Sequence, residues 1–285
     1  MSYAEAMRGK RFLGMAIVAA VLAAGVWTRQ RLYRSTPHLT RTPLRAPSAL
    51  SRLPFELTEA SGRVGVVATH RKFTRPASLK TVAPWRAAEA GASGAVADYD
   101  GDGWPDVYLT NAERGSLNRL FRNNRDGTFT DTAVKAGVAD INQRTGSLRA
   151  LFFDRDNDGH KDLLVNTTYC PRFFRNRGDG TFEDASRASG LDHCGYAHAS
   201  NVMDYDGDGF LDVVIGDFYK SVDVFNPSTL KFLFNRLHYA DNGGPINVYH
   251  NDGGRSFSRA PGNLGIKSRG WTHAIGVYDF RGTGR

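Results

Sequence analysis

A nine-residue acidic motif, D-x-D-x-D-G-x-x-D, occurs three times in this chain, at residues 98–106, 154–162 and 204–212. Carboxylates crowded at positions 1, 3, 5 and 9 would repel one another and raise each other's pKa if no cation were present. Calcium removes this repulsion, because it accepts about 6–8 oxygen ligands from a tight loop that a glycine allows to turn. The motif therefore predicts three calcium sites with the ligands Asp98, Asp100, Asp102, Asp106, Asp154, Asp156, Asp158, Asp162, Asp204, Asp206, Asp208 and Asp212.

The EF-hand loop opens in the same way but needs a Glu at position 12 and a helix on each side. Position 12 is Leu109, Val165 and Ile215 in the three copies. The residues after each final Asp form short β-branched or aromatic runs, which are typical of strands. The acidic loops are therefore predicted to join β-strands.

A longer repeat surrounds the acidic loops. Phe129–Gly137 matches Phe182–Gly190, Phe257–Gly265 keeps the same spacing, and Phe55–Gly62 reads as a shorter relative. Asp-Gly or Gly-Gly turns precede three of these Phe residues and predict hairpins. One unit then reads strand, acidic loop, strand, connection, strand, turn, strand.

Four antiparallel strands that repeat about every 40–50 residues are typical of propeller blades. We therefore predict an all-β fold, a β-propeller of four-stranded blades, with about three to four blades in this chain. A β-sandwich would not place an identical acidic loop at the same point of each unit. A fourth loop begins at Asp279 but has Arg281 and Thr283 in place of two ligands. We expect the chain to be a piece of a longer protein.

The first 54 residues differ in composition from the rest. Residues 12–27 form an uncharged apolar run of 16 residues behind a basic start, which predicts a signal peptide or an N-terminal membrane anchor over residues 1–27. Arg residues follow the run at once, and both alternatives stay open. Residues 28–54 are rich in Arg, Pro and Ser and read as a linker, so the repeats are assigned to 55–285. We expect an exported protein, periplasmic, cell-surface or secreted.

The basic charge does not belong to the repeats. Residues 1–82 hold 14 Lys and Arg against 3 Asp and Glu, whereas residues 83–285 hold 23 against 26, so net charges of +11 and −3 add to +8. A mildly acidic repeat region argues against nucleic acid as a partner.

Two further features lie within the repeats. Cys170 and Cys194 are the two cysteines, and in an exported protein such a pair predicts a disulfide, although two buried thiols are the alternative. It would link the second strand of one unit to the entry of the next. Extra sequence between Phe218 and Asn247 is rich in aromatic residues, which would form a partner-binding patch or pack on the blade edge.

The stretch Gly94–Asn111 resembles the FG-GAP/VCBS repeat, and Asn123–Asp131 resembles the variant found in the ASPIC/UnbV (cartilage acidic protein-like) group. The resemblance covers about Phe55 to Arg285. It implies a seven-bladed propeller like the integrin α-subunit head, with calcium in the hairpin loops. Members of the group are mostly exported and have inferred adhesion or binding roles. The C-terminal ASPIC/UnbV domain that usually accompanies the repeats is not in this sequence.

The sequence thus predicts an exported calcium-binding β-propeller that acts as a binding, cell-adhesion or protein-interaction module. The expected ligand is a protein or glycan at the cell surface, with possible membrane attachment through residues 12–27. No catalytic residues and no cofactor other than Ca²⁺ are expected. The alternative is a polysaccharide-active enzyme, a lyase or hydrolase, since propellers host many chemistries. That alternative needs an acid/base pair outside the repeat pattern, and the sequence shows none.

Overall fold

In the computed structural model the chain forms two compact units, Met1–Glu59 and Ala60–Arg285, and the second contains nearly all of the residues described here. The structure describes residues 58–71, 93–192, 194–218, 243–268 and 270–279. The predicted leader, the linker, most of the aromatic insert and the end of the fourth loop lie outside these ranges. No helix within them is long and apolar enough to span a membrane.

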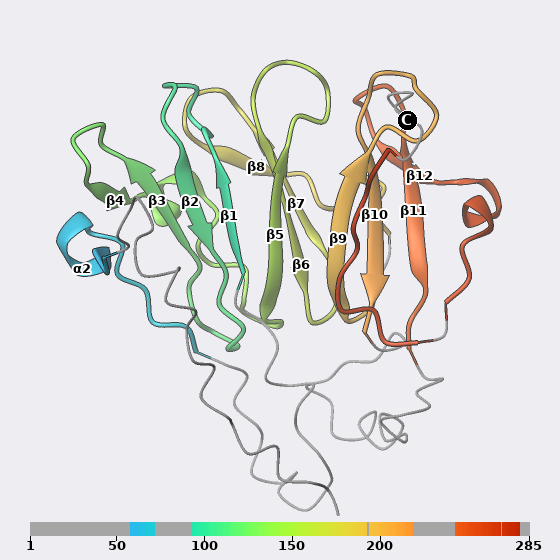
Figure 1. Ribbon diagram of the computed structural model, residues 1–285, viewed down its shortest axis with the longest axis horizontal. Helices are drawn as coiled ribbons and strands as arrows, with labels where there is room; N and C mark the ends of the chain where they lie inside the picture. The colour runs from blue at the N-terminus through green and yellow to red at the C-terminus, as the bar shows by residue number, and fades with distance from the viewer. Residues whose placement is uncertain (1–57, 72–92, 193, 219–242, 269, 280–285) are drawn as a thin grey trace, which may run out of the picture. The chain divides into compact units, whose positions relative to one another are not determined.

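Three four-stranded antiparallel sheets form the second unit, each with its strands in chain order (Figure 1). The first sheet is β1 (Gly94–Ala97), β2 (Asp106–Leu109), β3 (Arg119–Asn123) and β4 (Phe129–Asp131). The second is β5 (Ser147–Phe153), β6 (Asp162–Thr167), β7 (Arg172–Asn176) and β8 (Phe182–Asp184). The third is β9 (Ala197–Met203), β10 (Asp212–Asp217), β11 (Ile246–Asn251) and β12 (Phe257–Arg259).

This arrangement confirms the predicted order of strand, acidic loop, strand, connection, strand, turn and strand in each unit. The sheets have the form of propeller blades, and the all-β fold class is confirmed as a partial β-propeller. Each acidic loop is a hairpin connection, since β1 pairs with β2, β5 with β6 and β9 with β10. All three acidic loops lie at the upper end of the sheets in Figure 1.

Apolar side chains that alternate along the second strand of each blade fill the spaces between blades. Leu163 and Val165 of β6 point into the cluster shared with blade 1, and Leu164 points into the cluster shared with blade 3. Every residue of β6 is therefore buried, which explains its continuous apolar sequence. In β2, by contrast, buried and half-buried residues alternate.

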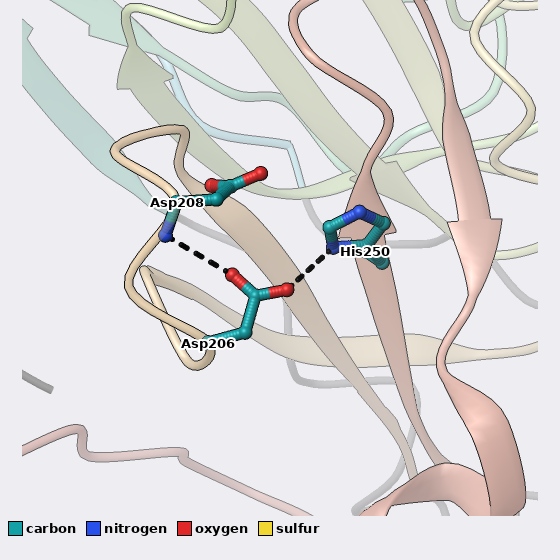
Figure 2. Close-up of side chains that lie close together, drawn as sticks. All are labelled: Asp206, Asp208 and His250. Atoms are coloured by element: carbon teal, nitrogen blue, oxygen red, sulfur yellow. Dashed lines mark hydrogen bonds and ion pairs between the residues drawn. The ribbon is translucent and has the colours of Figure 1, made fainter.

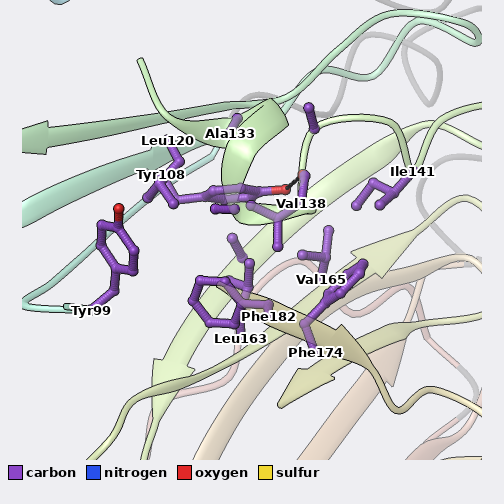
Figure 3. Close-up of a cluster of buried hydrophobic side chains, with 13 residues drawn as sticks. Tyr99, Tyr108, Leu120, Ala133, Val138, Ile141, Leu163, Val165, Phe174 and Phe182 are labelled. Atoms are coloured by element: carbon purple, nitrogen blue, oxygen red, sulfur yellow. Dashed lines mark hydrogen bonds between the residues drawn. The ribbon is translucent and has the colours of Figure 1, made fainter. Parts of the chain in front are cut away.

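The cluster between blades 1 and 2 combines both sheets (Figure 3). Tyr108 is fully buried in it and its hydroxyl donates to the carbonyl of Val138 at 2.8 Å, so the phenol brings no unpaired polar atom into the core. The rings of Tyr99 and Phe182 stack at 5.8 Å between centroids. Burial of such large aromatic side chains on folding stabilises each blade pair by about 1.5–3 kcal/mol per side chain.

Short helical turns follow the outer strands of the first and third sheets, as α3 (Ala133–Ala136) and the 3₁₀-type segment η5 (Pro261–Gly265), and a similar turn, α2 (Ser61–Val64), precedes β1. The sequence did not predict them. Gly137 ends α3 with φ of 81°. Gly190, with φ of 80°, lies so close to the next blade that an added Cβ would stand 2.0 Å from the Phe257 carbonyl oxygen. A side chain has no room at this position.

The close contact of a glycine with the neighbouring blade also shows which residues form the first copy of the repeat. Gly65, with φ of 83°, ends α2, and a Cβ there would stand 2.7 Å from the Phe129 carbonyl oxygen, as Gly137 faces Phe182 and Gly190 faces Phe257. Gly62 has no such neighbour. The repeat therefore aligns Leu57–Gly65 with the later copies. The predicted alignment of Phe55–Gly62 was wrong, because it followed a matching Phe and not the glycine that the packing requires.

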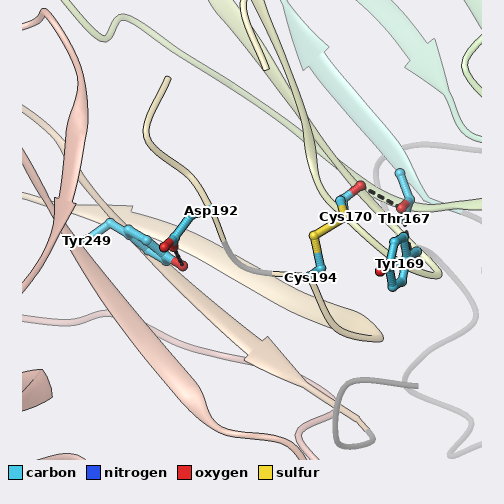
Figure 4. Close-up of a disulfide and its surroundings, with 6 residues drawn as sticks. All are labelled: Thr167, Tyr169, Cys170, Asp192, Cys194 and Tyr249. Atoms are coloured by element: carbon cyan, nitrogen blue, oxygen red, sulfur yellow. Dashed lines mark hydrogen bonds between the residues drawn. A yellow bond between two sulfur atoms is a disulfide. The ribbon is translucent and has the colours of Figure 1, made fainter. Parts of the chain in front are cut away.

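The predicted disulfide joins Cys170, in the loop between β6 and β7, to Cys194, in the connection to β9 (Figure 4). Neighbouring bonds fix both ends. Thr167 Oγ1 donates to the carbonyl of Cys170 at 2.7 Å, and Gly195 N donates to the carbonyl of Tyr169 at 2.7 Å. The bridge therefore ties blade 2 to the entry of blade 3.

Replacement of both cysteines by serine is expected to lower the free energy of unfolding by about 3 kcal/mol, because the bridge closes a loop of 24 residues in the unfolded chain. Urea unfolding of the oxidised wild type and the double variant measures the difference. Reduction of the wild type should reproduce it. Equal urea midpoints for all three forms would show that the bridge adds no stability.

Candidate metal sites in the acidic loops

Backbone N–H groups shape each acidic loop around its first Asp. Asp98 Oδ2 accepts from Gly103 N at 2.8 Å, and the equivalent bonds from Gly159 to Asp154 and from Gly209 to Asp204 are both 3.0 Å. These three glycines stand at position 6 with φ between 86° and 89°. The predicted role of the motif glycine is thus confirmed, because an L side chain rarely adopts this conformation.

The fifth residue of each loop supports the turn as well. Asp102, Asp158 and Asp208 each accept a hydrogen bond from the backbone N–H two residues later, at 2.8 to 2.9 Å. The second oxygen of Asp102 accepts a further hydrogen bond, from Arg125 Nε at 3.0 Å. The fourth position also has a positive φ, even in the second loop, where it is Asn157 at 58°. Asn tolerates this conformation better than other non-glycine residues.

The ninth residue of each loop is buried at the base of the hairpin. Asp106 and Asp212 have no exposed surface and Asp162 is 2% exposed. Each accepts a short hydrogen bond from the backbone N–H of the Asn that ends the third strand: Asn123, Asn176 and Asn251, at 2.7, 2.7 and 2.8 Å. Three buried carboxylates therefore hold the acidic loops against the third strands.

The same Asn side chains reach the preceding blade. Asn176 Nδ2 donates to the carbonyl of Tyr99, in the first loop, at 2.8 Å, and Asn251 Nδ2 donates to the carbonyl of Arg155, in the second loop, at 2.9 Å. Each Asn also donates to the residue before the buried Asp of its own loop. We call this arrangement of position-9 Asp and strand-end Asn the Asp–Asn clamp. It couples each acidic loop to the next one.

Burial changes the proton affinity of the clamp carboxylates. It raises the pKa of Asp106 from its usual 3.8 to about 6, although N–H groups of Asn123 and Tyr99 favour the charged form. Burial raises the pKa of Asp162 to about 6 in the same way and also raises that of Asp212. Neighbouring loop carboxylates add to each shift. A bound cation would stabilise the charged forms.

These shifts predict how the stability of the metal-free chain depends on pH. A carboxyl group whose pKa is higher in the folded state stabilises the fold below pH 3.8, and this contribution is lost as the pH rises through about 6. The unfolding midpoint in a chelator should therefore fall between about pH 4 and pH 6. In excess calcium it should not fall. A chelator series that rises over this range would contradict the burial of these carboxylates.

The structure brings most of the predicted ligands together. Potential ligand atoms lie within 4.8 Å of one another in four groups: Asp98, Asp100 and Asp106; Asp154, Asp156 and Asp158; Asp204, Asp206 and Asp212; and Asp206, Asp208 and His250. Asp102 and Asp162 fall outside these groups. Asp102 instead pairs with Arg125 at 2.9 Å, and Asp162 lies 3.8 Å from the Nε atom of Arg155. Their expected role as ligands stays a prediction.

Two carboxylate oxygens have the character that a cation site requires. Asp100 Oδ1 and Asp154 Oδ1 are buried and accept no hydrogen bond from any residue of the described chain. An unpaired buried carboxylate oxygen is unfavourable by several kcal/mol. Each belongs to one of the carboxylate groups, so a hard divalent ion between them fits the residues present.

Sequence reasoning missed the cations around the loops. In the first loop Arg122 lies 3.6 Å from Asp100. In the second, Arg155 and Arg175 lie 3.2 and 3.7 Å from Asp156. Lys161 lies 3.7 Å from Asp154 in that loop. In the third loop the side chain at the equivalent place is the imidazole of His250. The Arg before the strand-end Asn of the first two units was the available signal in the sequence.

Arg155 compensates part of the negative charge of the second acidic loop, because it lies beside Asp156 and Asp162. It is 7% exposed and occupies position 2, where the other loops have Tyr. Substitution Arg155→Tyr is expected to raise the calcium affinity of this loop about tenfold, since a buried competing charge is removed. Calorimetric titration of the full chain measures it, with Arg144→Gln, an exposed arginine, as the control. An unchanged affinity would show that Arg155 does not compete with the ion.

Comparison with known proteins agrees with this geometry. The FG-GAP-like repeat profile matches residues 98–165 and 154–215, which contain the three acidic loops. Cartilage acidic protein 1 of Xenopus tropicalis is 29% identical over 140 residues, and the human protein of that name is 29% identical over 142 residues. Each match covers 45% of this chain and 21% of the relative, so the chain spans about a fifth of either relative.

A solved structure of an Agrocybe aegerita lectin that recognises non-reducing terminal N-acetylglucosamine also matches, over 57% of this chain and 49% of the lectin. Its sequence identity is 17% and the TM-score is 0.26, which is too low to establish a common fold or ligand. The repeat profile and the equivalent blades show that residues 98–215 consist of FG-GAP-like repeats, and the chain is similar to cartilage acidic protein 1 over part of its length.

Proposed function

We propose that this chain is an exported calcium-binding β-propeller module whose role is to bind a protein or glycan ligand. The observation that carries the calcium assignment is the pair of buried, unpaired carboxylate oxygens of Asp100 and Asp154 inside equivalent acidic loops. Calcium would compensate their charge and hold each hairpin in one conformation. Its role is structural, because the Asp–Asn clamp connects the loops to the blades.

The repeat family and the acidic clusters support an interaction module. In the described part of the chain, the clusters of carboxylates lie in the acidic loops. The first Asp of each loop accepts a hydrogen bond from a backbone N–H group of its own hairpin. This engagement favours cation binding over proton transfer to a substrate. The polysaccharide-active enzyme stays the alternative, and turnover of a polysaccharide panel by the full chain would favour it.

Calcium titration of the full chain tests the metal assignment. We expect saturable binding with up to three ions per chain. A triple variant with Asp98→Asn, Asp154→Asn and Asp204→Asn should lose it, because each loop then lacks its first carboxylate. Asp126→Asn, in the turn after β3, is the matched control and should bind as the wild type does. Equal binding by the triple variant would refute the proposal.

Export is supported by the disulfide between Cys170 and Cys194, since such bonds persist in oxidising compartments. The apolar run at residues 12–27 would direct export and either be removed or attach the protein to a membrane. Fractionation of cells that express the full chain, with mass determination of its N-terminus, separates these two outcomes. A chain recovered with reduced cysteines in the cytosol would contradict export.

A further inference from the structure

One position beside the three acidic loops holds a different type of side chain in the third blade than in the first two. The residue before the strand-end Asn is Arg122 in β3, Arg175 in β7 and His250 in β11. All three side chains lie over the third-position carboxylate of their loop, with distances of 3.6 Å to Asp100, 3.7 Å to Asp156 and 3.1 Å to Asp206. The blades therefore place a guanidinium twice and an imidazole once at the same point.

The two side chains have opposite effects on a cation. A guanidinium stays protonated, has no lone pair to donate and repels a metal ion. A neutral imidazole nitrogen is one of the commonest metal ligands in proteins. His250 is thus the place among the three loops where the neighbour of the carboxylates can coordinate an ion.

The His250 side chain points at the carboxylates of the third loop and pairs with Asp206 (Figure 2). Its Nδ1 atom is buried and makes no hydrogen bond within the described chain. That atom lies 3.1 Å from Asp206 Oδ2 and 3.4 Å from Asp212 Oδ1. The ring of Tyr205 packs edge-on against the imidazole, at 6.0 Å between centroids, and helps to fix its orientation.

The surrounding carboxylates complete a mixed set. The ligand atoms of Asp206, Asp208 and His250 lie within 4.8 Å of one another, and Asp206 also belongs to the group with Asp204 and Asp212. The groups in the first two loops consist of carboxylates alone. Oxygen ligands suit calcium, whereas imidazole nitrogen favours ions such as Zn²⁺ and Co²⁺.

We propose that the third loop is a mixed nitrogen–oxygen site for a divalent transition metal of the Zn²⁺ class, with His250 Nδ1, Asp206 and Asp208 as ligands. This inference rests on the proposed function in that it takes the acidic loops to be cation sites. It departs from that function in assigning the third loop a different ion from the first two. Contraction of the group around the ion would bring the ligand atoms to the short distances that zinc requires.

Zinc titration of the calcium-saturated full chain tests the proposal, with X-ray absorption of the zinc-loaded protein as the structural readout. We expect one tight zinc site whose spectrum contains scattering from one imidazole. Substitution His250→Gln should weaken zinc binding at least about 10–100-fold. Loss of a residue that only orients a metal ligand already lowers metal affinity by this factor, and loss of the ligand itself should lower it at least as much. His160→Gln, a histidine in the second loop, is the matched control and should keep wild-type zinc affinity.

Circular dichroism shows whether His250→Gln folds as the wild type does. A second variant, which should gain a zinc site, tests the proposal even if His250→Gln does not fold. Arg122→His puts an imidazole over Asp100 and should create a second zinc site in the first loop. Zinc coordination by oxygen alone, or affinity unchanged in His250→Gln, would overturn the inference while calcium binding in the other loops still supports the proposed function. A full chain that binds neither calcium nor zinc would overturn both.

Discussion

Removal of calcium is expected to lower the thermal unfolding midpoint of the chain by about 5–10 °C for each occupied loop. An ion present at a hundredfold excess over its Kd stabilises the folded state by about 2.7 kcal/mol. For a domain of 150–250 residues, each kcal/mol shifts the midpoint by about 2–4 °C. The second unit spans residues 60–285, so this relation is appropriate to it.

The physical cause lies in the buried carboxylates. Without an ion, Asp106 and Asp212 keep their charge in a site without solvent exposure, beside the other carboxylates of the same loop. Buried and mutually repelling charges destabilise the folded state. Loss of the ion in one loop should also weaken the next, because Asn176 and Asn251 bond to the carbonyls of the preceding loops.

Thermal unfolding followed by circular dichroism, in excess calcium and in excess chelator at pH 7, measures the effect. Return of calcium to the chelated sample should restore the higher midpoint, which excludes irreversible damage. Magnesium at the same concentration should restore less, since it prefers a smaller and more rigid octahedral site. Identical midpoints with and without chelator would show that the loops hold no structural calcium.

The repeated motif explains why so much of the fold could be predicted. Each copy fixes a tight loop through its glycine, and the apolar runs on both sides must then be the two strands of a hairpin. Runs such as Leu163-Leu164-Val165, with no polar alternation, indicate a strand buried on both faces, as β6 is. Local patterns were sufficient here because a blade is itself a local unit of structure.

The coupling between loops could not be predicted in this way. Asn176 and Tyr99 are 77 residues apart, and Asn251 and Arg155 are 96 apart, so no local periodicity relates them. The inward position of Arg155 depends likewise on the carbonyl of Arg255 in the third blade, which it reaches at 3.3 Å. Such contacts arise only when blades pack side by side, and they decide which loops are partly neutralised.

Replacement of Asn176 by Ala is expected to lower the free energy of unfolding by about 4 kcal/mol. The side chain is 2% exposed and makes three hydrogen bonds: to the carbonyls of Tyr99 and Lys161, at 2.8 and 3.0 Å, and from Gly178 N at 2.9 Å. The net contribution of each hydrogen bond to stability is about 1 kcal/mol, and a buried polar group left without a partner destabilises the fold by about 1–3 kcal/mol. The substitution removes all three bonds and leaves two carbonyls unpaired.

Two other asparagines separate the contributions in urea unfolding. Asn124→Ala removes the bonds with Thr128 and Thr130 within one hairpin and should cost about 1 kcal/mol. Asn123→Ala removes a clamp side chain whose bonds in the described chain stay within its own blade, to Pro105 and from Arg125. Its effect should fall between the other two. The difference between Asn176→Ala and Asn123→Ala then measures the bond between blades.

Calcium affinity gives this prediction a readout that stability alone cannot supply. If the clamp transmits the state of one loop to the next, Asn176→Ala should weaken calcium binding in the first loop, although its own carboxylates are untouched, because the Tyr99 carbonyl stands between Asp98 and Asp100. A variant that loses stability but binds calcium in that loop as the wild type does would mean that the clamp only joins the blades. A loss in both would mean that the metal sites and the packing of the propeller form one cooperative system.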